Sequence, residues 1–206
     1  MIDSIHIKSK LCVPFPERKI FFRLGGSVNL TQIDESELLK LKSTALKAAC
    51  ACAPQGRWRL LEVKEFTPDT ITFSDGSTLT GSRFIDMAKD ATHIWFGAVT
   101  AGKNVIELRD KEKSVADQTV CDAAASEIAD CAMDMLQNLA ASELLRCGIH
   151  LAQRRFSPGY GNMPLDTQKL FFTTLKLEEM GLKLSDNCYI TPEKSVTAVA
   201  AAHLLR

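Results

Sequence analysis

The sequence lacks an excess of charge of either sign, a long apolar run and a recognisable leader. Its 206 residues include 25 basic and 25 acidic side chains, so the formal net charge is zero. A neutral chain gives no electrostatic reason to expect nucleic acid or anionic lipid as a partner. No apolar run approaches the length that spans a bilayer, and residues 1–10 are polar and alternating, unlike a signal peptide. We therefore expect a cytoplasmic protein without a membrane partner.

Several motifs of common enzyme classes are also missing. There is no P-loop, and Leu24-Gly25-Gly26 lacks the third glycine of a dinucleotide fingerprint. The seven cysteines form no C-x-x-C pair, and Cys50 and Cys52 point apart on an expected helix. We expect no metal site, and we expect the cysteines to be reduced, small core residues. His150, three residues after Cys147, leaves a thiol enzyme as one alternative.

Apolar periodicity and turn residues predict a mixture of strands and helices. Strands are expected near residues 5–7 and at 57–63, 91–100, 182–190 and 195–202, with a hairpin at 70–79 that turns at Asp75-Gly76. Helices are expected at 34–53, 82–89, 103–113, 117–147 and 166–180. The segment 18–24 stays ambiguous and ends at Gly25-Gly26.

Two features of these helices bear on the fold. The helix at 117–147 is long and rich in alanine, which favours close packing against a sheet. Asp166 is expected to cap the next helix, and Gly181 to end it. No linker divides the chain. We therefore predict an α+β fold, with long helices packed on a mainly antiparallel, twisted sheet, in a single domain of residues 1–206.

The most unusual stretch is Arg154-Arg155-Phe156-Ser157-Pro158-Gly159-Tyr160-Gly161-Asn162-Met163-Pro164. Pro158 stiffens the backbone, while Gly159 and Gly161 admit positive φ and let a ligand approach closely. Arg155 offers a fork of donors suited to carboxylate or phosphate, and Tyr160 a flat face with a polar tip. We expect a stiff, extended loop that binds a small ligand with an acid end and a flat ring. A surface turn with two solvated arginines is the alternative.

The pattern Arg155-x-Ser157-Pro158-Gly159-Tyr160-Gly161-x-x-Pro164 is followed by further spaced elements. These are Gln168, Leu170-Phe171-Phe172, Gly181-Leu182-Lys183-Leu184-Ser185 and Ile190-Thr191-Pro192-x-Lys194-Ser195-Val196. In this order they closely resemble the activation domain of vitamin-B12-dependent methionine synthase, over roughly residues 154 to 200. Looser likenesses occur upstream, at 101–105 and 122–127.

The resemblance implies a domain that binds S-adenosylmethionine and docks against the cobalamin domain of methionine synthase. There it presents the sulfonium methyl to the cobalt while a flavodoxin- or ferredoxin-type donor reduces the metal. Because the sequence has no D-x-H-x-x-G motif for cobalamin, we expect a stand-alone module that acts in trans on a methionine synthase or its corrinoid domain. Such a chain belongs to a methyltransferase system of methionine biosynthesis and is not an independent catalyst. The alternative is a non-catalytic partner of a truncated methionine synthase or other corrinoid protein, with ligand binding lost.

The resemblance also assigns ligand-binding roles residue by residue, with no catalytic residue. It places Arg155 on the ligand carboxylate, Gly159 and Tyr160 in loop contacts, and the Ser157 backbone against the adenine. Glu127 is the candidate for the ligand amino group, against the alternative of a solvated helix face. Outside this set, Lys194 is expected to pair with an acid, and Ser195 to be a strand residue.

Two departures from the family pattern affect the expected pocket. The acid that precedes the loop arginine in the family is absent from Cys147-Gly148-Ile149-His150. The family residues that follow the last strand have no counterpart up to Arg206. We therefore expect one side of the pocket to be missing or rebuilt, and the ligand affinity to be reduced.

Overall fold

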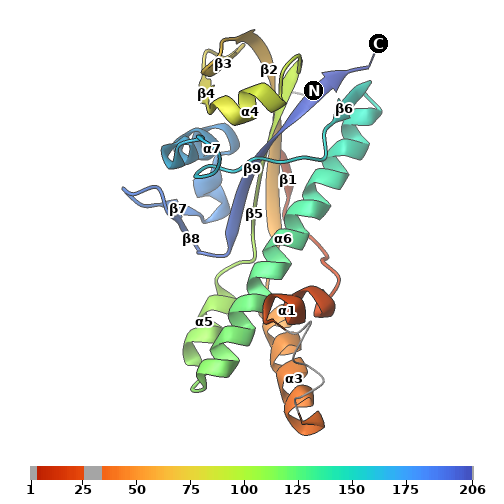
Figure 1. Ribbon diagram of the computed structural model, residues 1–206, viewed down its shortest axis with the longest axis vertical. Helices are drawn as coiled ribbons and strands as arrows, with labels where there is room; N and C mark the ends of the chain where they lie inside the picture. The colour runs from red at the N-terminus through yellow and green to blue at the C-terminus, as the bar shows by residue number, and fades with distance from the viewer. Residues whose placement is uncertain (1–3, 26–33, 206) are drawn as a thin grey trace.

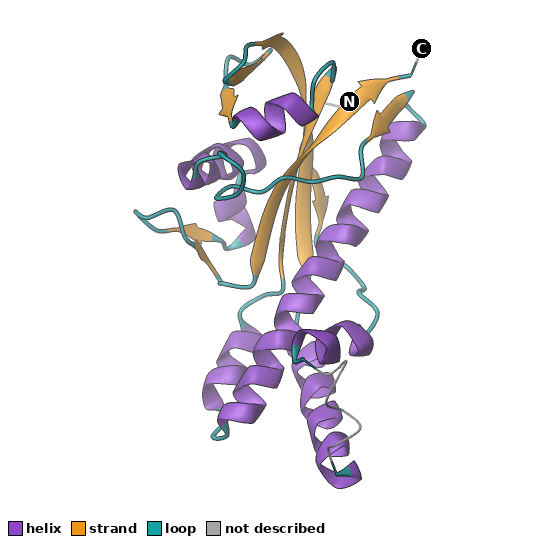
Figure 2. Ribbon diagram, in the orientation of Figure 1, coloured by secondary structure: helices purple, strands orange, loops and turns teal. Residues whose placement is uncertain are grey.

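The computed structural model describes residues 4–25 and 34–205, and its centre is a large twisted sheet with helices on both faces (Figures 1 and 2). The strands run in the order β4-β3-β2-β5-β9-β6, and β1 pairs with the N-terminal part of β2, whereas β3 pairs with its C-terminal part. Their bounds are β1 (His6–Lys8), β2 (Gln55–Phe66), β3 (Thr70–Phe73), β4 (Thr78–Thr80), β5 (His93–Thr100), β6 (Ile149–Leu151) and β9 (Ser195–Leu204). A separate hairpin joins β7 (Lys183–Leu184) to β8 (Ile190–Thr191). All these pairs are antiparallel, which confirms the predicted fold class.

The helices form two groups around this sheet. Their bounds are α1 (Glu17–Arg23), α3 (Glu35–Ala51), α4 (Ser82–Met87), α5 (Asn104–Lys111), α6 (Val115–Leu145) and α7 (Gln168–Leu175). The 3₁₀ turns η2 (Leu165–Thr167) and η3 (Leu177–Met180) flank α7. In Figure 1, α6 runs along one face of the sheet, and α4 and α7 lie on the other. The helices α1, α3 and α5 gather around the N-terminal part of α6.

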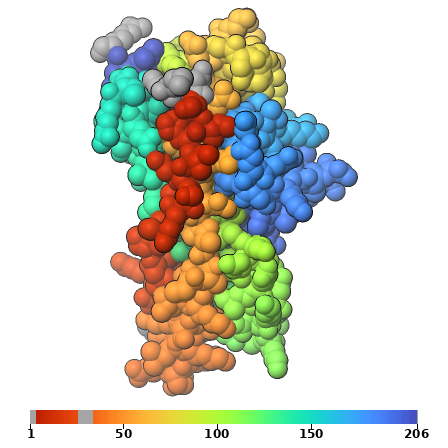
Figure 3. Space-filling model, turned by 180° about the vertical axis from the view of Figure 1, so that it is seen from behind, coloured from red at the N-terminus to blue at the C-terminus, as the bar shows by residue number. Residues whose placement is uncertain are grey.

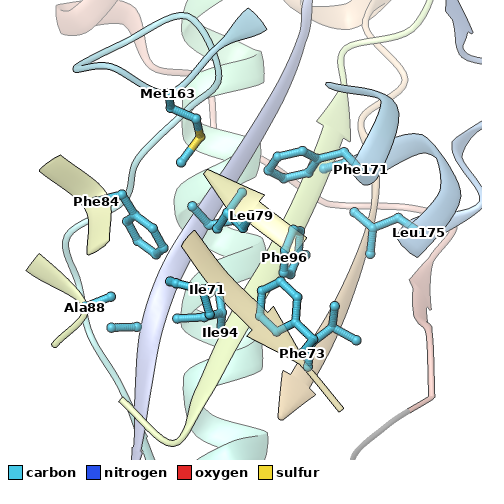
Figure 4. Close-up of a cluster of buried hydrophobic side chains, with 14 of the residues drawn as sticks. Ile71, Phe73, Leu79, Phe84, Ala88, Ile94, Phe96, Met163, Phe171 and Leu175 are labelled. Atoms are coloured by element: carbon cyan, nitrogen blue, oxygen red, sulfur yellow. The ribbon is translucent and has the colours of Figure 1, made fainter. Parts of the chain in front are cut away.

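Each face of the sheet has its own apolar core. On the side of α4 and α7, Phe73, Phe84, Phe96 and Phe171 form the centre of a cluster (Figure 4). On the side of α6, Trp58 and Trp95 pack among the aliphatic side chains of the helix and strands β6 and β9. A third cluster fills the space between α1, α3, α5 and α6. In the view from behind, the N-terminal segment, in red, runs down the molecule toward α3, in orange (Figure 3).

The long helix α6 forms as its sequence predicts. Ser114 precedes its first turn, and its hydroxyl accepts a hydrogen bond from the Asp117 backbone N–H at 3.4 Å. The buried positions along its 31 residues include many alanines, whose small side chains let the helix approach the sheet and the neighbouring helices closely. The described residues include no helix with both the length and the apolarity to cross a membrane.

The helix expected at 166–180 is interrupted, contrary to the prediction. Lys176 adopts the left-handed conformation with φ of 50°, and separates α7 from η3. Asp166 makes no capping hydrogen bond from its side chain, although Gly181 ends the segment with φ of 79° as expected. The break is stabilised from a distant strand, because Arg57 Nη1 donates to the carbonyl oxygens of Leu175 and Lys176 at 3.1 and 2.7 Å.

Two other expectations need correction or completion, and one strand was not expected. The strand expected at 182–190 is a hairpin, because a turn at Ser185 and Cys188 reverses the chain. The ambiguous segment 18–24 belongs to α1, which ends before Gly25 at φ of 80°; Gly26 lies outside the described residues, as does Arg206. Strand β6 was not predicted.

The cysteines are free thiols but are not all core residues. Cys121 and Cys188 are buried as expected, and Cys52 and Cys131 are half-buried. The remaining three are exposed, which contradicts the expectation: Cys12, Cys50 and Cys147. Burial raises the pKa of the Cys52 thiol to about 12, so this thiol is held in its neutral form.

Candidate functional site

A groove of about 900 Å³ lies between the C-terminal half of α6, strand β6 and the segment 152–157, which we call the strap. The helix contributes Asp130, Asp134 and Gln137 to its walls, and β9 contributes Val196 and Ala198. The groove is open to solvent and has both polar and apolar surface. A volume of this size is in the range of pockets that hold a small ligand or a cofactor.

The strap is pinned to β9 at two points. Near its start, the Ala152 N–H donates to the Ala201 carbonyl at 2.8 Å. Near its end, Phe156 and Val199 exchange two backbone hydrogen bonds of 2.9 and 2.8 Å. Between these two points the strap runs from residue 152 to residue 156, whereas β9 covers only residues 199 to 201. The surplus residues loop out of the ladder, and among them is Arg155.

Arg155 is held by two side chains of α6. Its Nη2 donates to Asp134 Oδ1 at 2.7 Å, and its Nη1 donates to Gln137 Oε1 at 2.6 Å. The guanidinium is half-buried, whereas neighbouring Arg154 is exposed. These short bonds fix the guanidinium at the wall of the groove. The alternative of two solvated arginines therefore does not describe Arg155.

A strip of acidic side chains follows the same side of α6. Asp130 receives a hydrogen bond from Arg23 Nη2 at 2.9 Å, and Asp134 lies 3.6 Å from Lys19 Nζ through its second oxygen. Burial raises the pKa of the Asp130 carboxyl, and Glu127 and Asp134 reinforce this effect against the opposing charge of Arg23. Asp130 and Asp134 therefore form an acidic wall of the groove, which Arg23, Lys19 and Arg155 neutralise in part.

Glu127 lies one helical turn beyond Asp130 and is paired inside the protein. Its carboxylate accepts a hydrogen bond from Arg23 Nε at 2.6 Å, and the residue is 8% exposed. It is therefore not on a solvated helix face, and it does not line the groove. Its role toward the amino group of a ligand stays a prediction.

The loop after the strap is a compact series of turns, not an extended segment. Gly159 and Gly161 have φ of 88° and 50°, the positive values that the sequence predicted. The N–H groups of Gly159, Tyr160 and Met163 bond to carbonyls within the loop at 2.9, 3.2 and 2.9 Å. These donors therefore do not point sideways toward a ligand, as an extended loop would direct them.

The structure brings some of the predicted site residues together and leaves others apart. Arg155 and Ser157 line the groove, and Gly159 lies in the adjacent turn. Tyr160 is 71% exposed and lies outside the groove lining. The contacts of Gly159 and Tyr160 with a ligand stay predictions.

Two residues that hold Arg155 were not predicted from the sequence. They are Asp134 and Gln137. The available signal was a polar stripe at i, i+4 and i+7, formed by Asp130, Asp134 and Gln137 on one side of the helix. Asp134 also supplies the acid beside Arg155 that is absent from residues 147–150.

The described residues also bear on the expectations for Lys194, for Ser195, for a thiol enzyme and for a metal site. Lys194 pairs with Asp122 at 2.8 Å, as predicted, and Ser195 is the first residue of β9. Cys147 is a free, exposed thiol, and no hydrogen bond between Cys147 and His150 occurs in the described part of the chain; the thiol-enzyme alternative stays a prediction. Residues 4–25 and 34–205 include no cluster of three metal-ligating side chains.

No family model and no curated protein matches this sequence. Among solved structures, the chain is similar to the MetH reactivation domain bound to AdoHcy, with a TM-score of 0.68 and 16% sequence identity. The superposition covers 98% of this chain and 79% of that chain. The chain therefore has the fold of the MetH reactivation domain.

Proposed function

We propose that this chain binds S-adenosylmethionine in the groove beside the strap and reactivates a cobalamin-dependent methionine synthase in trans. The observation that supports this most directly is Arg155, fixed at the groove wall of a fold that in another protein occurs with AdoHcy bound. AdoHcy is the thioether that remains when S-adenosylmethionine gives up its methyl group. The two ligands share the adenosyl and amino-acid parts that a binding site recognises.

The charges of the groove suit the charges of S-adenosylmethionine. The ligand carboxylate would meet donors of the Arg155 guanidinium, which has five N–H groups. Its ammonium and sulfonium, both positive, would face Asp130 and Asp134 on α6. The adenine would lie against the strap backbone near Ser157, which lines the groove.

The contribution of this protein would be to bind and orient the ligand. S-adenosylmethionine supplies an electrophilic sulfonium methyl, for transfer to a corrinoid on the partner that a flavodoxin- or ferredoxin-type donor has reduced. Arg155 and the acids of α6 would hold the carboxylate and the ammonium, which share one carbon of the ligand, and the adenine would be held near Ser157. The sulfonium lies between these two anchored parts of the ligand, so its position would be fixed.

One contact favours the alternative, a non-catalytic partner module that no longer binds the ligand. Asp134 already gives Arg155 a carboxylate at 2.7 Å. This internal acid occupies part of the guanidinium fork and competes with a ligand carboxylate. Binding therefore requires that the ligand uses the remaining donors or displaces Asp134.

Calorimetric titration with S-adenosylmethionine and AdoHcy tests the ligand. We expect both to bind, and we expect Arg155→Ala to weaken each by about tenfold or more, through loss of a charge-assisted contact. Arg154→Ala is the matched control, because this neighbouring arginine is exposed and should leave the affinity unchanged. No heat at roughly millimolar ligand would contradict ligand binding.

Co-purification with a corrinoid protein tests the partner. Capture of the cobalamin domain of a methionine synthase that increases with S-adenosylmethionine supports the reactivation role. Capture that is independent of the ligand favours the non-catalytic module. Recovery of methionine synthase activity after addition of this chain, the ligand and a flavodoxin-type donor completes the test.

A further inference from the structure

Gln137 is a buried side chain whose hydrogen bonds connect α6 to the strap. It is 6% exposed and lies one helical turn from Asp134. Its Nε2 donates to the carbonyl oxygens of Ala152 and Gln153 at 2.7 and 3.1 Å. Its Oε1 accepts the Arg155 bond at 2.6 Å. One amide thus contacts both the start of the strap and Arg155, which lies in its looped-out part.

The partners of Gln137 allow only one orientation of its amide. The two carbonyl oxygens can only accept hydrogen bonds, so they require the NH₂ group. The guanidinium can only donate, so it requires the oxygen. A flipped amide would place oxygen against oxygen and NH₂ against a cation. The strap carbonyls therefore determine which end of Gln137 faces Arg155.

We propose that Gln137 is the positioning residue that sets Arg155 for recognition of a ligand carboxylate, an inference that rests on the proposed function. While Gln137 accepts a hydrogen bond from Nη1, Asp134 accepts one from Nη2. Without Gln137, the guanidinium is free to turn and form a two-point pair with Asp134. That pair would occupy the donors that a ligand carboxylate needs.

The test compares two ligands that differ only in the carboxylate, S-adenosylmethionine and decarboxylated S-adenosylmethionine. We expect Gln137→Met to weaken binding of the first by about tenfold and of the second by less than about twofold. Gln137→Glu should show the same selectivity, because its second oxygen would face the Ala152 and Gln153 carbonyls. The matched control is Gln168→Met, since Gln168 is 7% exposed, accepts from Thr197 Oγ1 at 2.9 Å and does not line the groove.

The outcomes separate positioning from a structural effect. Equal weakening of the two ligands, or the same weakening in Gln168→Met, would show that the loss of the buried amide acts through stability and would overturn the proposal. Unchanged affinity of both Gln137 variants for S-adenosylmethionine would also overturn it.

A second measurement does not depend on the ligand. The Nη1–H resonance of Arg155, assigned by its loss in Arg155→Lys, should be slow to exchange in the unsubstituted protein, where Nη1 donates to Gln137, and broadened in Gln137→Met. If the unsubstituted protein binds neither ligand, the proposed function fails, and this resonance alone decides the positioning role. An unchanged resonance in Gln137→Met would then refute it.

Discussion

Replacing Gly161 with alanine tests whether the turn after the strap is shaped by contact with Phe156. Gly161 has φ of 50°, and a Cβ atom at this position would lie 2.8 Å from Cε1 of the Phe156 ring. The position of the ring is restrained. Its centroid lies 6.0 Å from the centroid of the Phe84 ring, and the Phe156 backbone is hydrogen-bonded to Val199. The substitution therefore forces a shift at the end of the strap.

The expected cost has two parts. An alanine in the left-handed region costs about 1–2 kcal/mol, and overpacking against the ring adds about 1–3 kcal/mol. Gly159→Ala is the matched control, because Gly159 has φ of 88° but its Cβ would meet only Leu165 Cδ1, at an ordinary 3.5 Å. We expect Gly161→Ala to be the more destabilising of the two by about 1–3 kcal/mol.

Urea unfolding of the single variants and of a double-mutant cycle measures these terms. Phe156→Leu replaces the ring with a shorter side chain, so Gly161→Ala should cost less in that background, with a coupling of about 1 kcal/mol or more. The affinity for S-adenosylmethionine should fall in Gly161→Ala, because Phe156 is adjacent to Arg155. Equal destabilisation by the two glycine substitutions, together with zero coupling, would refute the steric explanation.

Three further predictions concern stability. Arg57→Met should lower the free energy of unfolding in urea by about 2–4 kcal/mol, since it removes a buried cation from the carbonyls at the end of α7. Glu179→Gln should lower it by under about 0.5 kcal/mol, because that carboxylate is exposed. Similar costs for the two substitutions would contradict this explanation. Arg155→Ala should change the unfolding free energy by only about 1 kcal/mol, because Asp134 is half-exposed; a loss above about 3 kcal/mol would make Arg155 structural. Burial lowers the pKa of His6 below 6.5, so the unfolded chain binds this proton more readily and stability falls as the pH drops below that value. His6→Phe should flatten the difference between melting temperatures at about pH 5.5 and about pH 7.5, and an unchanged difference would exclude His6 as its source.

Local signals predicted most of the regular elements. The hairpin at 70–79 follows from Asp75-Gly76, where Gly76 has φ of 83° and Asp75 Oδ1 accepts the Ser77 N–H at 2.9 Å. The break at Lys176 has no such signal, because lysine favours a helix and the stabilising partner Arg57 comes from a distant strand. Strand β6 is equally hidden, since an alternation of only three residues is too short to predict a strand without the pairing with β9.

The candidate site was predictable on the strap and not on the helix. Arg155 and the positive φ of Gly159 and Gly161 follow from a local combination of residue types. Asp134 and Gln137 are ordinary polar residues in a helical sequence, and only the packing of the strap over α6 gives them a role. A resemblance confined mostly to residues 154–200 could not reveal partners that precede it.

The basic side of α1 has a consequence for shortened versions of the chain. A fragment that begins at residue 34 would keep every residue of the groove lining. It would nevertheless lose Lys19 and Arg23, the cations beside Asp134, Asp130 and Glu127. The electrostatic potential of the groove would become more negative, so such a fragment would attract polyamines and other simple cations and repel carboxylates. Lys19 and Arg23 of α1 would thus influence which charges enter a groove that this helix does not line.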